Sequence, residues 1–218
     1  MKHMKKILTV ACAMALSAAI AIGGTLAYLT STDEVVNTFT VGNVQIKLDE
    51  AKANADGSLV DGADRVQANS YKLLPGHTYN KDPMVTVLAN SEACYVFASI
   101  TFNKVDEINA IEALDIRTSG LSKLLGGMSN KWELMSNTVN DDSTQTILFK
   151  YNAVVPGATT DTKLDKLFTT VTLPGEVTNA ELATLEGFEM TINAYAIQAD
   201  GFASAEAAWA AYANQAKD

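Results

Sequence analysis

Histidine and cysteine, the side chains with the widest catalytic chemistry, are scarce in this sequence. The 218 residues contain His3 and Cys12 near the N-terminus, and His77 and Cys94 in the interior. His77 follows Leu-Pro-Gly, which is typical of a turn, and it has no second imidazole downstream with which to share a zinc ion. Cys94 lies in an alternating apolar segment, where a buried thiol is usually inert. We therefore predict no catalytic residue, no metal site and no cofactor.

Acidic residues gather in two places where calcium binding has to be considered. One is the segment containing Asp56, Asp61 and Asp64, and the other is Asp141-Asp142. Neither has the ligand spacing of an EF-hand loop. Residues 51–68 are also rich in Ala, Asp, Gly and Asn, so we interpret this segment as a mobile, solvated surface excursion.

The N-terminus differs in composition from the rest of the chain. Three lysines precede an uncharged apolar run over residues 7–22, and small residues then stand at Thr25 and Ala27. This layout is typical of a secretory signal peptide, here residues 1–27, cut between Ala27 and Tyr28. A retained membrane anchor is the alternative, but the run falls short of about 18–20 spanning residues. We expect an exported, secreted protein.

Composition excludes several classes of protein. The formal charge is −9 and becomes more negative when the lysines of the signal peptide are removed, so the basic face that nucleic-acid binding requires is missing. Apolar residues make up 48% of the chain, which excludes a fully disordered protein. One apolar stretch approaches membrane-spanning length, so a multi-pass protein is excluded and only the uncleaved precursor is expected to contact a membrane. A single cysteine remains after cleavage, and stability must come from packing.

Alternation of apolar and polar residues predicts a single β domain over residues 42–218. The alternating segments, clearest first, are residues 188–196, 94–102, 147–155, 84–88, 131–135 and 167–173. Thr, Val, Tyr and Phe fill them, as a half-buried pleated surface prefers. Six or more antiparallel strands with long connections predict a mainly β fold, a jelly-roll-like antiparallel β-sandwich.

Helical patterns interrupt these strands as insertions. Apolar residues recur at three-residue steps over residues 105–114 and continue over 121–125. Residues 202–212 place four apolar side chains on one helical face, with Ser204 as the N-cap. The last pattern predicts a short C-terminal helix.

The segment after the cleavage site changes its apolar phase. Three apolar residues before the change share one parity: Val35, Phe39 and Val41. Those after it share the other parity: Val44, Ile46 and Leu48. A one-residue slip turns a strand over, so the change at Gly42-Asn43 indicates either a bulged first strand or two separate elements. In the second case residues 28–41 are a separate strand whose apolar face can pair with another sheet edge.

Several motifs along the chain resemble a known family. They are Gly23-Gly24-Thr25-Leu26-Ala27-Tyr28, Thr32-Asp33-Glu34, Asn37-Thr38-Phe39-Thr40-Val41-Gly42-Asn43-Val44, Leu74-Pro75-Gly76, Lys81-Asp82-Pro83, Cys94-Tyr95-Val96-Phe97 and Ala194-Tyr195-Ala196-Ile197-Gln198-Ala199-Asp200-Gly201-Phe202. In these motifs the chain resembles the TasA/camelysin family of exported biofilm-matrix proteins of Gram-positive bacteria. The match is strongest over residues 20–48 and 188–212.

The resemblance implies an extracellular structural subunit. A SipW-type signal peptidase cuts such precursors, and the N-terminal strand of one subunit completes the sheet of the next. Carried onto this chain, residues 28–41 are the donor strand, with Gly42 and Asn43 as the hinge. Such head-to-tail pairing is heterologous and gives an open filament. The expected partners are other copies of the chain and the signal peptidase, with a matrix polysaccharide or an accessory matrix protein as further candidates.

Two functions from other classes remain as alternatives. The first is a monomeric cell-surface adhesin or carbohydrate-binding β-sandwich, with Tyr71, Tyr79 and Trp132 as exposed contact residues. The second is a metallopeptidase, as camelysin-type relatives have been classed. This sequence lacks a recognisable zinc-ligand pair, so we do not carry the peptidase activity over.

Overall fold

Antiparallel pairing organises the part of the chain that the computed structural model describes, which is residues 43–117 and 120–215. Its strands are β1 (Ile46–Asp49), β2 (Thr78–Asn80), β3 (Met84–Val87), β4 (Cys94–Phe102), β5 (Leu125–Gly126), β6 (Trp132–Val139), β7 (Gln145–Tyr151), β8 (Thr162–Lys163), β9 (Thr170–Thr172) and β10 (Met190–Gln198). They form three sheets with the orders β1-β3-β8, β10-β4-β7-β6 and β2-β9-β5. The predicted mainly β class is confirmed, while jelly-roll connectivity stays a prediction.

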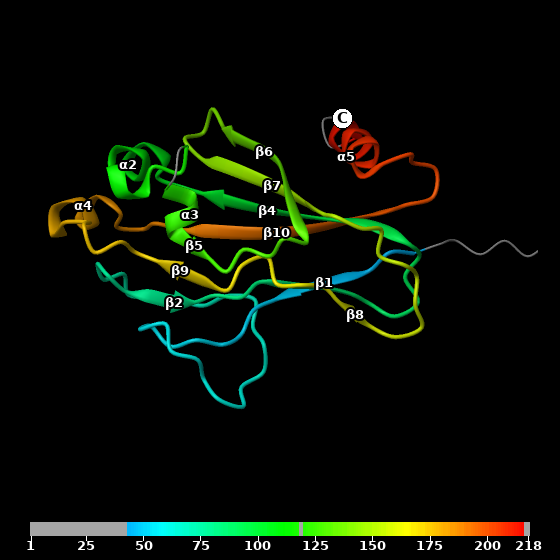
Figure 1. The fold of residues 1–218 in the computed structure, drawn as a ribbon, viewed down its shortest axis with the longest axis horizontal. Coiled ribbons are helices and arrows are strands. Elements are labelled where there is room, and N and C mark those ends of the chain that lie inside the picture. Colours follow the sequence, from blue (N-terminus) through cyan, green and yellow to red (C-terminus); the bar gives the residue numbers. More distant parts are fainter. Residues whose placement is uncertain (1–42, 118–119, 216–218) are drawn as a thin grey trace, which may run out of the picture. The chain divides into compact units, whose positions relative to one another are not determined.

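The sheets face one another across a shared apolar core. Ile100 and Phe102 of β4 and Ile147 of β7 meet Val85 and Val87 of β3, and all five are at most 3% exposed. Figure 1 shows the four-stranded sheet above the two smaller sheets. Burying one side chain of this size contributes about 1.5–3 kcal/mol, so contacts between the layers are the main source of stability.

The strand β4 is covered on both faces, although its sequence predicts one half-exposed face. Phe97 and Ser99 lie on the face turned away from the main core, yet they are 0% and 4% exposed. The C-terminal helix α5 (Ala205–Gln215) packs on this face, with the ring of Trp209 5.0 Å from that of Phe97. Ser204 accepts a hydrogen bond from the Ala207 N–H (3.2 Å), which confirms the predicted helix and its N-cap.

The other helical insertions are short. They are α2 (Val105–Ala110), the 3-10 helix η1 (Glu112–Leu114), α3 (Gly120–Leu124) and α4 (Asn179–Thr184). The continuous helical pattern predicted over residues 105–114 is divided because Ile111 has extended backbone angles (φ −88°, ψ 108°). The apolar residues of this pattern nevertheless face the core, since Val105, Ile108 and Leu114 are all buried.

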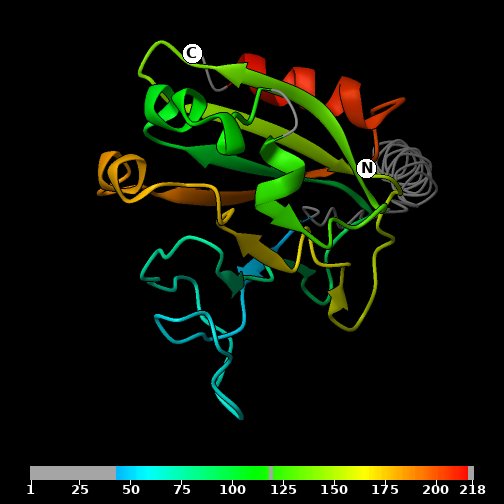
Figure 2. The same cartoon turned by 60° about the vertical axis from the view of Figure 1, so that its left-hand side comes forward.

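The long loop after β1 has most of its residues between 51 and 68 exposed, as predicted for a solvated surface excursion, and it is tied to the domain at several points. Glu50 and Val66 exchange two backbone hydrogen bonds of 2.8 Å. Gly57 has a φ of +85°, and a Cβ there would lie 2.6 Å from the Cα of Tyr79, so only glycine fits this contact. Asn80 donates from its backbone N–H to the Gly57 carbonyl (3.1 Å). The loop, blue to cyan in Figure 2, therefore projects from the sheets while its backbone is joined to them.

Candidate functional site

Two strand edges border one flank of the sandwich. β1 and β10 each stand at the end of their sheets, and within the described residues neither has a strand partner on its outer side. The two strands lie side by side, one from each layer (Figure 1). Because their ladders do not join, this flank combines two open edges with access to the core.

The edge of β1 presents both backbone groups and apolar side chains to the flank. The Gln45 carbonyl accepts from the Leu88 N–H (2.9 Å), so Gln45 faces β3. Residues of an antiparallel strand alternate in this respect, and Ile46 and Leu48 therefore direct their N–H and C=O groups away from β3. The side chains of Val44, Ile46 and Leu48 are only half-buried, although they pack against the core.

The edge of β10 has the same arrangement. The Glu189 carbonyl accepts from the Asn103 N–H (3.3 Å). The odd-numbered residues of β10 therefore direct their backbone N–H and C=O groups toward β4, and the even-numbered residues direct theirs toward the flank. The side chains at four of these even positions pack against the core yet remain half-exposed: Met190, Ile192, Ala194 and Ala196. Among residues 43–117 and 120–215, neither edge therefore has a strand beside it on its outer side.

A groove follows this flank, and we call it the β1–β10 groove. It consists of two hollows of about 430 and 530 Å³, which share residues of β10 and of the loop that follows β1. The shared lining residues are Ala68, Asn69, Lys81, Met190 and Thr191. Free backbone groups along two edges, with apolar side chains such as Ile46 and Met190 among polar ones in the lining, are features that can bind an extended strand.

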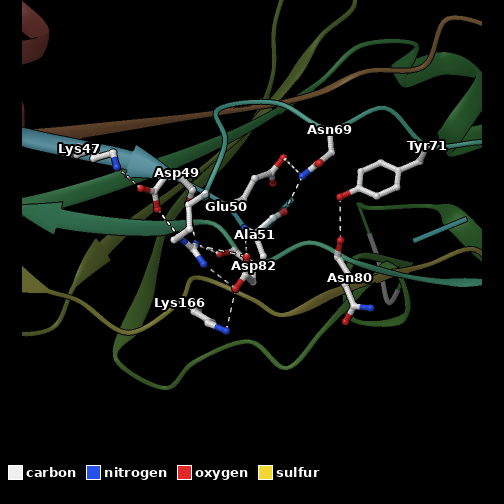
Figure 3. A network of polar contacts seen from close by, with 10 residues as sticks. Lys47, Asp49, Glu50, Ala51, Asn69, Tyr71, Asn80, Asp82 and Lys166 are labelled. Atoms are coloured by element: carbon white, nitrogen blue, oxygen red, sulfur yellow. Dashed lines mark hydrogen bonds and ion pairs between the residues drawn. The ribbon is translucent and has the colours of Figure 1, made fainter. Parts of the chain in front are cut away.

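A charged cluster holds the loop against the end of β1. Arg65 donates from Nε to Asp49 Oδ1 (2.5 Å) and from Nη1 to Asp82 Oδ2 (3.1 Å). Its Nη2 donates to the main-chain carbonyls of the same two residues at 3.0 and 2.9 Å. Lys47 and Lys166 add ion pairs of 2.8 Å to Asp49 and Asp82, respectively (Figure 3). The cluster fixes the position of one wall of the groove.

Electrostatics keep both carboxylates of this cluster ionised. Burial alone raises the pKa of Asp49, but the hydrogen bonds from Lys47 and Arg65 outweigh it and the pKa is lowered. Burial likewise opposes ionisation of Asp82, and the Ala51 N–H, Lys166 and Arg65 reverse the effect, so that its pKa is lowered too. The cluster is therefore a charged clamp without a proton donor near neutral pH.

A second polar group lies beside the first and lines the groove. Glu50 is 4% exposed; its Oε2 contacts Lys81 Nζ (2.6 Å), and its Oε1 accepts from Asn69 Nδ2 (2.9 Å). The Asn69 Nδ2 also donates to the Ala51 carbonyl (2.9 Å), and its Oδ1 accepts from the Ala53 N–H (2.8 Å). One carboxylate thus holds an amine and a carboxamide together.

Most of the site residues that the sequence predicts fall outside the described residues. These are Ala27 and Tyr28 at the cleavage site, Val35, Phe39 and Val41 of the donor strand, and Gly42 of the hinge. Asn43 is described, and its carbonyl accepts from the Glu92 N–H (2.9 Å). The backbone of Asn43 is therefore hydrogen-bonded to the segment that precedes β4, and the hinge at Gly42 and Asn43 stays a prediction.

The structure corrects the predicted aromatic contact surface. Tyr79 is 1% exposed, and its hydroxyl donates to the Lys72 carbonyl (2.8 Å). Trp132 is 5% exposed and donates from Nε1 to the Asp165 carbonyl (2.9 Å). Tyr71 is half-buried and donates to the Asn80 carbonyl (2.8 Å). Tyr79 and Trp132 lie inside the fold because their hydroxyl and indole groups find backbone acceptors there, so these two rings are not exposed contact residues, whereas Tyr71 lines the groove.

His77 and Cys94, the two residues considered for catalysis, have the surroundings of a turn residue and of a core residue, respectively. His77 is exposed and follows a turn, with its N–H donating to the Leu74 carbonyl (3.2 Å), as the sequence predicts. Cys94 is fully buried, and burial raises the pKa of its thiol to about 11. Over residues 43–117 and 120–215, His, Cys, Asp and Glu form no group of three that could hold a metal ion.

Cys94 is expected to resist thiol reagents while the protein is folded. A chain that begins at Gly42 contains Cys94 alone, and at pH 8 a pKa of about 11 leaves about one thiol in a thousand ionised. Labelling by a chromogenic disulfide should therefore be at least roughly 100-fold slower in buffer than in denaturant, where the thiol is accessible. Equal rates under the two conditions would contradict this assignment.

Comparisons with protein-family models, with curated proteins and with solved structures gave no match to this chain. Among the helices of the described residues, none has the length and apolar character needed to cross a membrane.

Proposed function

We propose that this protein is an exported structural subunit that assembles head to tail into extracellular biofilm-matrix fibres. In this proposal residues 28–41 of one copy add a strand in the β1–β10 groove of the next. The protein has no enzymatic role, and its principal partner is another copy of itself. The signal peptide of residues 1–27 is removed before assembly.

The observation that carries this proposal is the open flank itself. Two edges that have no strand partner among the described residues border half-exposed apolar side chains, with Ile46 and Leu48 on one side and Met190 and Ile192 on the other. An inserted strand gives the free N–H and C=O groups partners and covers these side chains. Each backbone hydrogen bond contributes about 0.5–1.5 kcal/mol net, so several of them together with the apolar contacts make a stable joint.

The chain contains a suitable occupant directly before the described domain. Residues 28–41 precede Asn43, and Val35, Phe39 and Val41 lie on one face of an extended strand. A segment that turned back at Gly42-Asn43 would fill the groove within one copy, since Gly-Asn is a favourable hairpin turn. Exchange of the strand between copies makes similar contacts, which is why such swapping costs little free energy.

The proposal is tested by comparing chains that begin at Tyr28 and at Gly42. We expect filaments from the longer chain, in size-exclusion chromatography and negative-stain electron microscopy, and folded monomers from the shorter one. The circular dichroism spectrum of the shorter chain controls for folding. Monomers from both chains at high protein concentration would overturn spontaneous strand exchange and favour a strand that stays within its own copy.

A further inference from the structure

Glu50 holds an amine and a carboxamide on the two oxygens of one buried carboxylate. Lys81 Nζ lies 2.6 Å from Oε2, and Asn69 Nδ2 lies 2.9 Å from Oε1. The side chains of Lys81 and Glu50 are only 11% and 5% exposed. A lysine, an asparagine and a bridging carboxylate are the reactants and the proton carrier for one reaction, the formation of an amide bond between side chains.

We propose that Lys81 and Asn69 become joined by an intramolecular isopeptide bond, with Glu50 as the proton-transfer group. Lys81 precedes β3, Asn69 lies in the loop that follows β1, and Glu50 comes directly after β1. The bond would join the loop covalently to the chain segment that enters β3. This inference concerns the stability of one wall of the groove, and it does not depend on fibre assembly.

The contacts place each group where the reaction needs it. Proton transfer from Nζ to Oε2 along the 2.6 Å contact frees the lone pair of Lys81. In the proposed step Nζ then attacks Cγ of Asn69, whose carboxamide is hydrogen-bonded to the other oxygen of the same carboxylate. As the carbon becomes tetrahedral, negative charge develops on Asn69 Oδ1, which already accepts the Ala53 N–H at 2.8 Å. That backbone donor acts as a one-membered oxyanion hole.

The leaving group is Asn69 Nδ2, and the other oxygen of Glu50, Oε1, accepts its hydrogen bond. Asn69 Nδ2 is hydrogen-bonded to Oε1, so Glu50 can protonate it as the Cγ–Nδ2 bond breaks. Overall, two of the three ammonium protons of Lys81 pass through Glu50 to the departing nitrogen. One C–N bond forms, one breaks, and ammonium is released, while Glu50 is regenerated. No oxidant, cofactor or energy source is required.

The reacting groups lie at the wall of the β1–β10 groove, where the side chains of Glu50 and Lys81 are nearly buried and Asn69 is half-buried. Figure 3 shows the Asn69 amide between Glu50 and the half-buried Tyr71. Release of ammonia to bulk solvent makes the reaction irreversible in practice. The neighbouring Lys166–Asp82 pair lacks a bridged carboxamide and provides a control.

The test is mass spectrometry of the purified wild-type protein. The intact mass should be lower than the sequence mass by one molecule of ammonia. Trypsin should then yield residues 66–72 joined to residues 73–104, because a linked Lys81 is no longer a cleavage site. The Lys81→Arg and Glu50→Gln variants should regain the full mass, whereas Lys166→Arg should keep the link.

Two results would overturn the proposal. An intact mass equal to the sequence mass, together with separate tryptic peptides 73–81 and 82–104 from the wild type, would show that the three residues form hydrogen bonds only. A link that persists at the wild-type level in Glu50→Gln would remove the assigned role of Glu50. The wild-type measurement requires no variant to fold, so an unstable variant cannot obscure the result.

Discussion

A chain that begins at Tyr28 and carries Ile192→Arg is expected to remain monomeric where the unsubstituted chain forms filaments. Ile192 lines the β1–β10 groove on the inward face of β10. Arginine there places a charge where an incoming strand would cover it. Burial of an unpaired polar group costs about 2–3 kcal/mol in protein sites, which corresponds to roughly 30- to 150-fold weaker binding.

The same substitution can be measured without filaments. A labelled peptide of residues 28–41 should bind to a chain that begins at Gly42, and fluorescence anisotropy should show the loss of affinity in Ile192→Arg. Asn193→Arg is the matched control, because Asn193 is the next residue of the same strand and is exposed. Equal binding and equal filament formation by the two variants would place the acceptor surface elsewhere.

The sequence predicts the strands well where one face alone is buried. Val44, Ile46 and Leu48 pack against the core as predicted, and so do the even-numbered residues of β10. Period-two alternation depends only on which face of the strand meets the core. β4 shows the limit of this argument. Its outer face is buried by α5, a contact between distant parts of the chain that local periodicity does not contain.

The groove could be predicted only in part. Alternation identifies β1 and β10 as strands, but it does not say that each stands at the end of a sheet. The half-burial of the inward residues of β10 is the observation that distinguishes an edge from a central strand such as β4. That difference depends on which strands pair, and pairing is decided by contacts far apart in sequence.

The ion pairs of the charged clamp and of the neighbouring Glu50 group could not be predicted from the sequence, for the same reason. Arg65 and Asp49 are 16 residues apart, and Lys81 and Glu50 are 31 apart. In the sequence the loop between them is polar and rich in glycine and aspartate, a composition that favours a solvated excursion. Only the folded backbone brings these charges together, and their pairing converts that excursion into a fixed wall of the groove.

Replacement of Arg65 by methionine is expected to lower the free energy of unfolding by about 2–3 kcal/mol near neutral pH. Removal of one partner from a buried ion pair leaves an uncompensated charge, at a cost of about 3–5 kcal/mol. The expected value is smaller because Arg65 is 26% exposed and because Lys47 and Lys166 still contact the two aspartates. Arg117→Met is the control, since Arg117 is 55% exposed and its contact with Asp115 should change stability by less than about 1 kcal/mol.

The dependence on pH separates charge from packing in this variant. The pKa values of Asp49 and Asp82 are lowered in the folded protein, so both groups contribute stability above the ordinary aspartate pKa of about 4. That contribution is lost as the pH falls through their folded values. The difference between wild type and Arg65→Met, measured by urea unfolding, should therefore be largest near pH 7 and should shrink below about pH 4. A difference that stays constant down to about pH 3 would assign the effect to packing of the arginine stem, because hydrophobic contacts do not titrate.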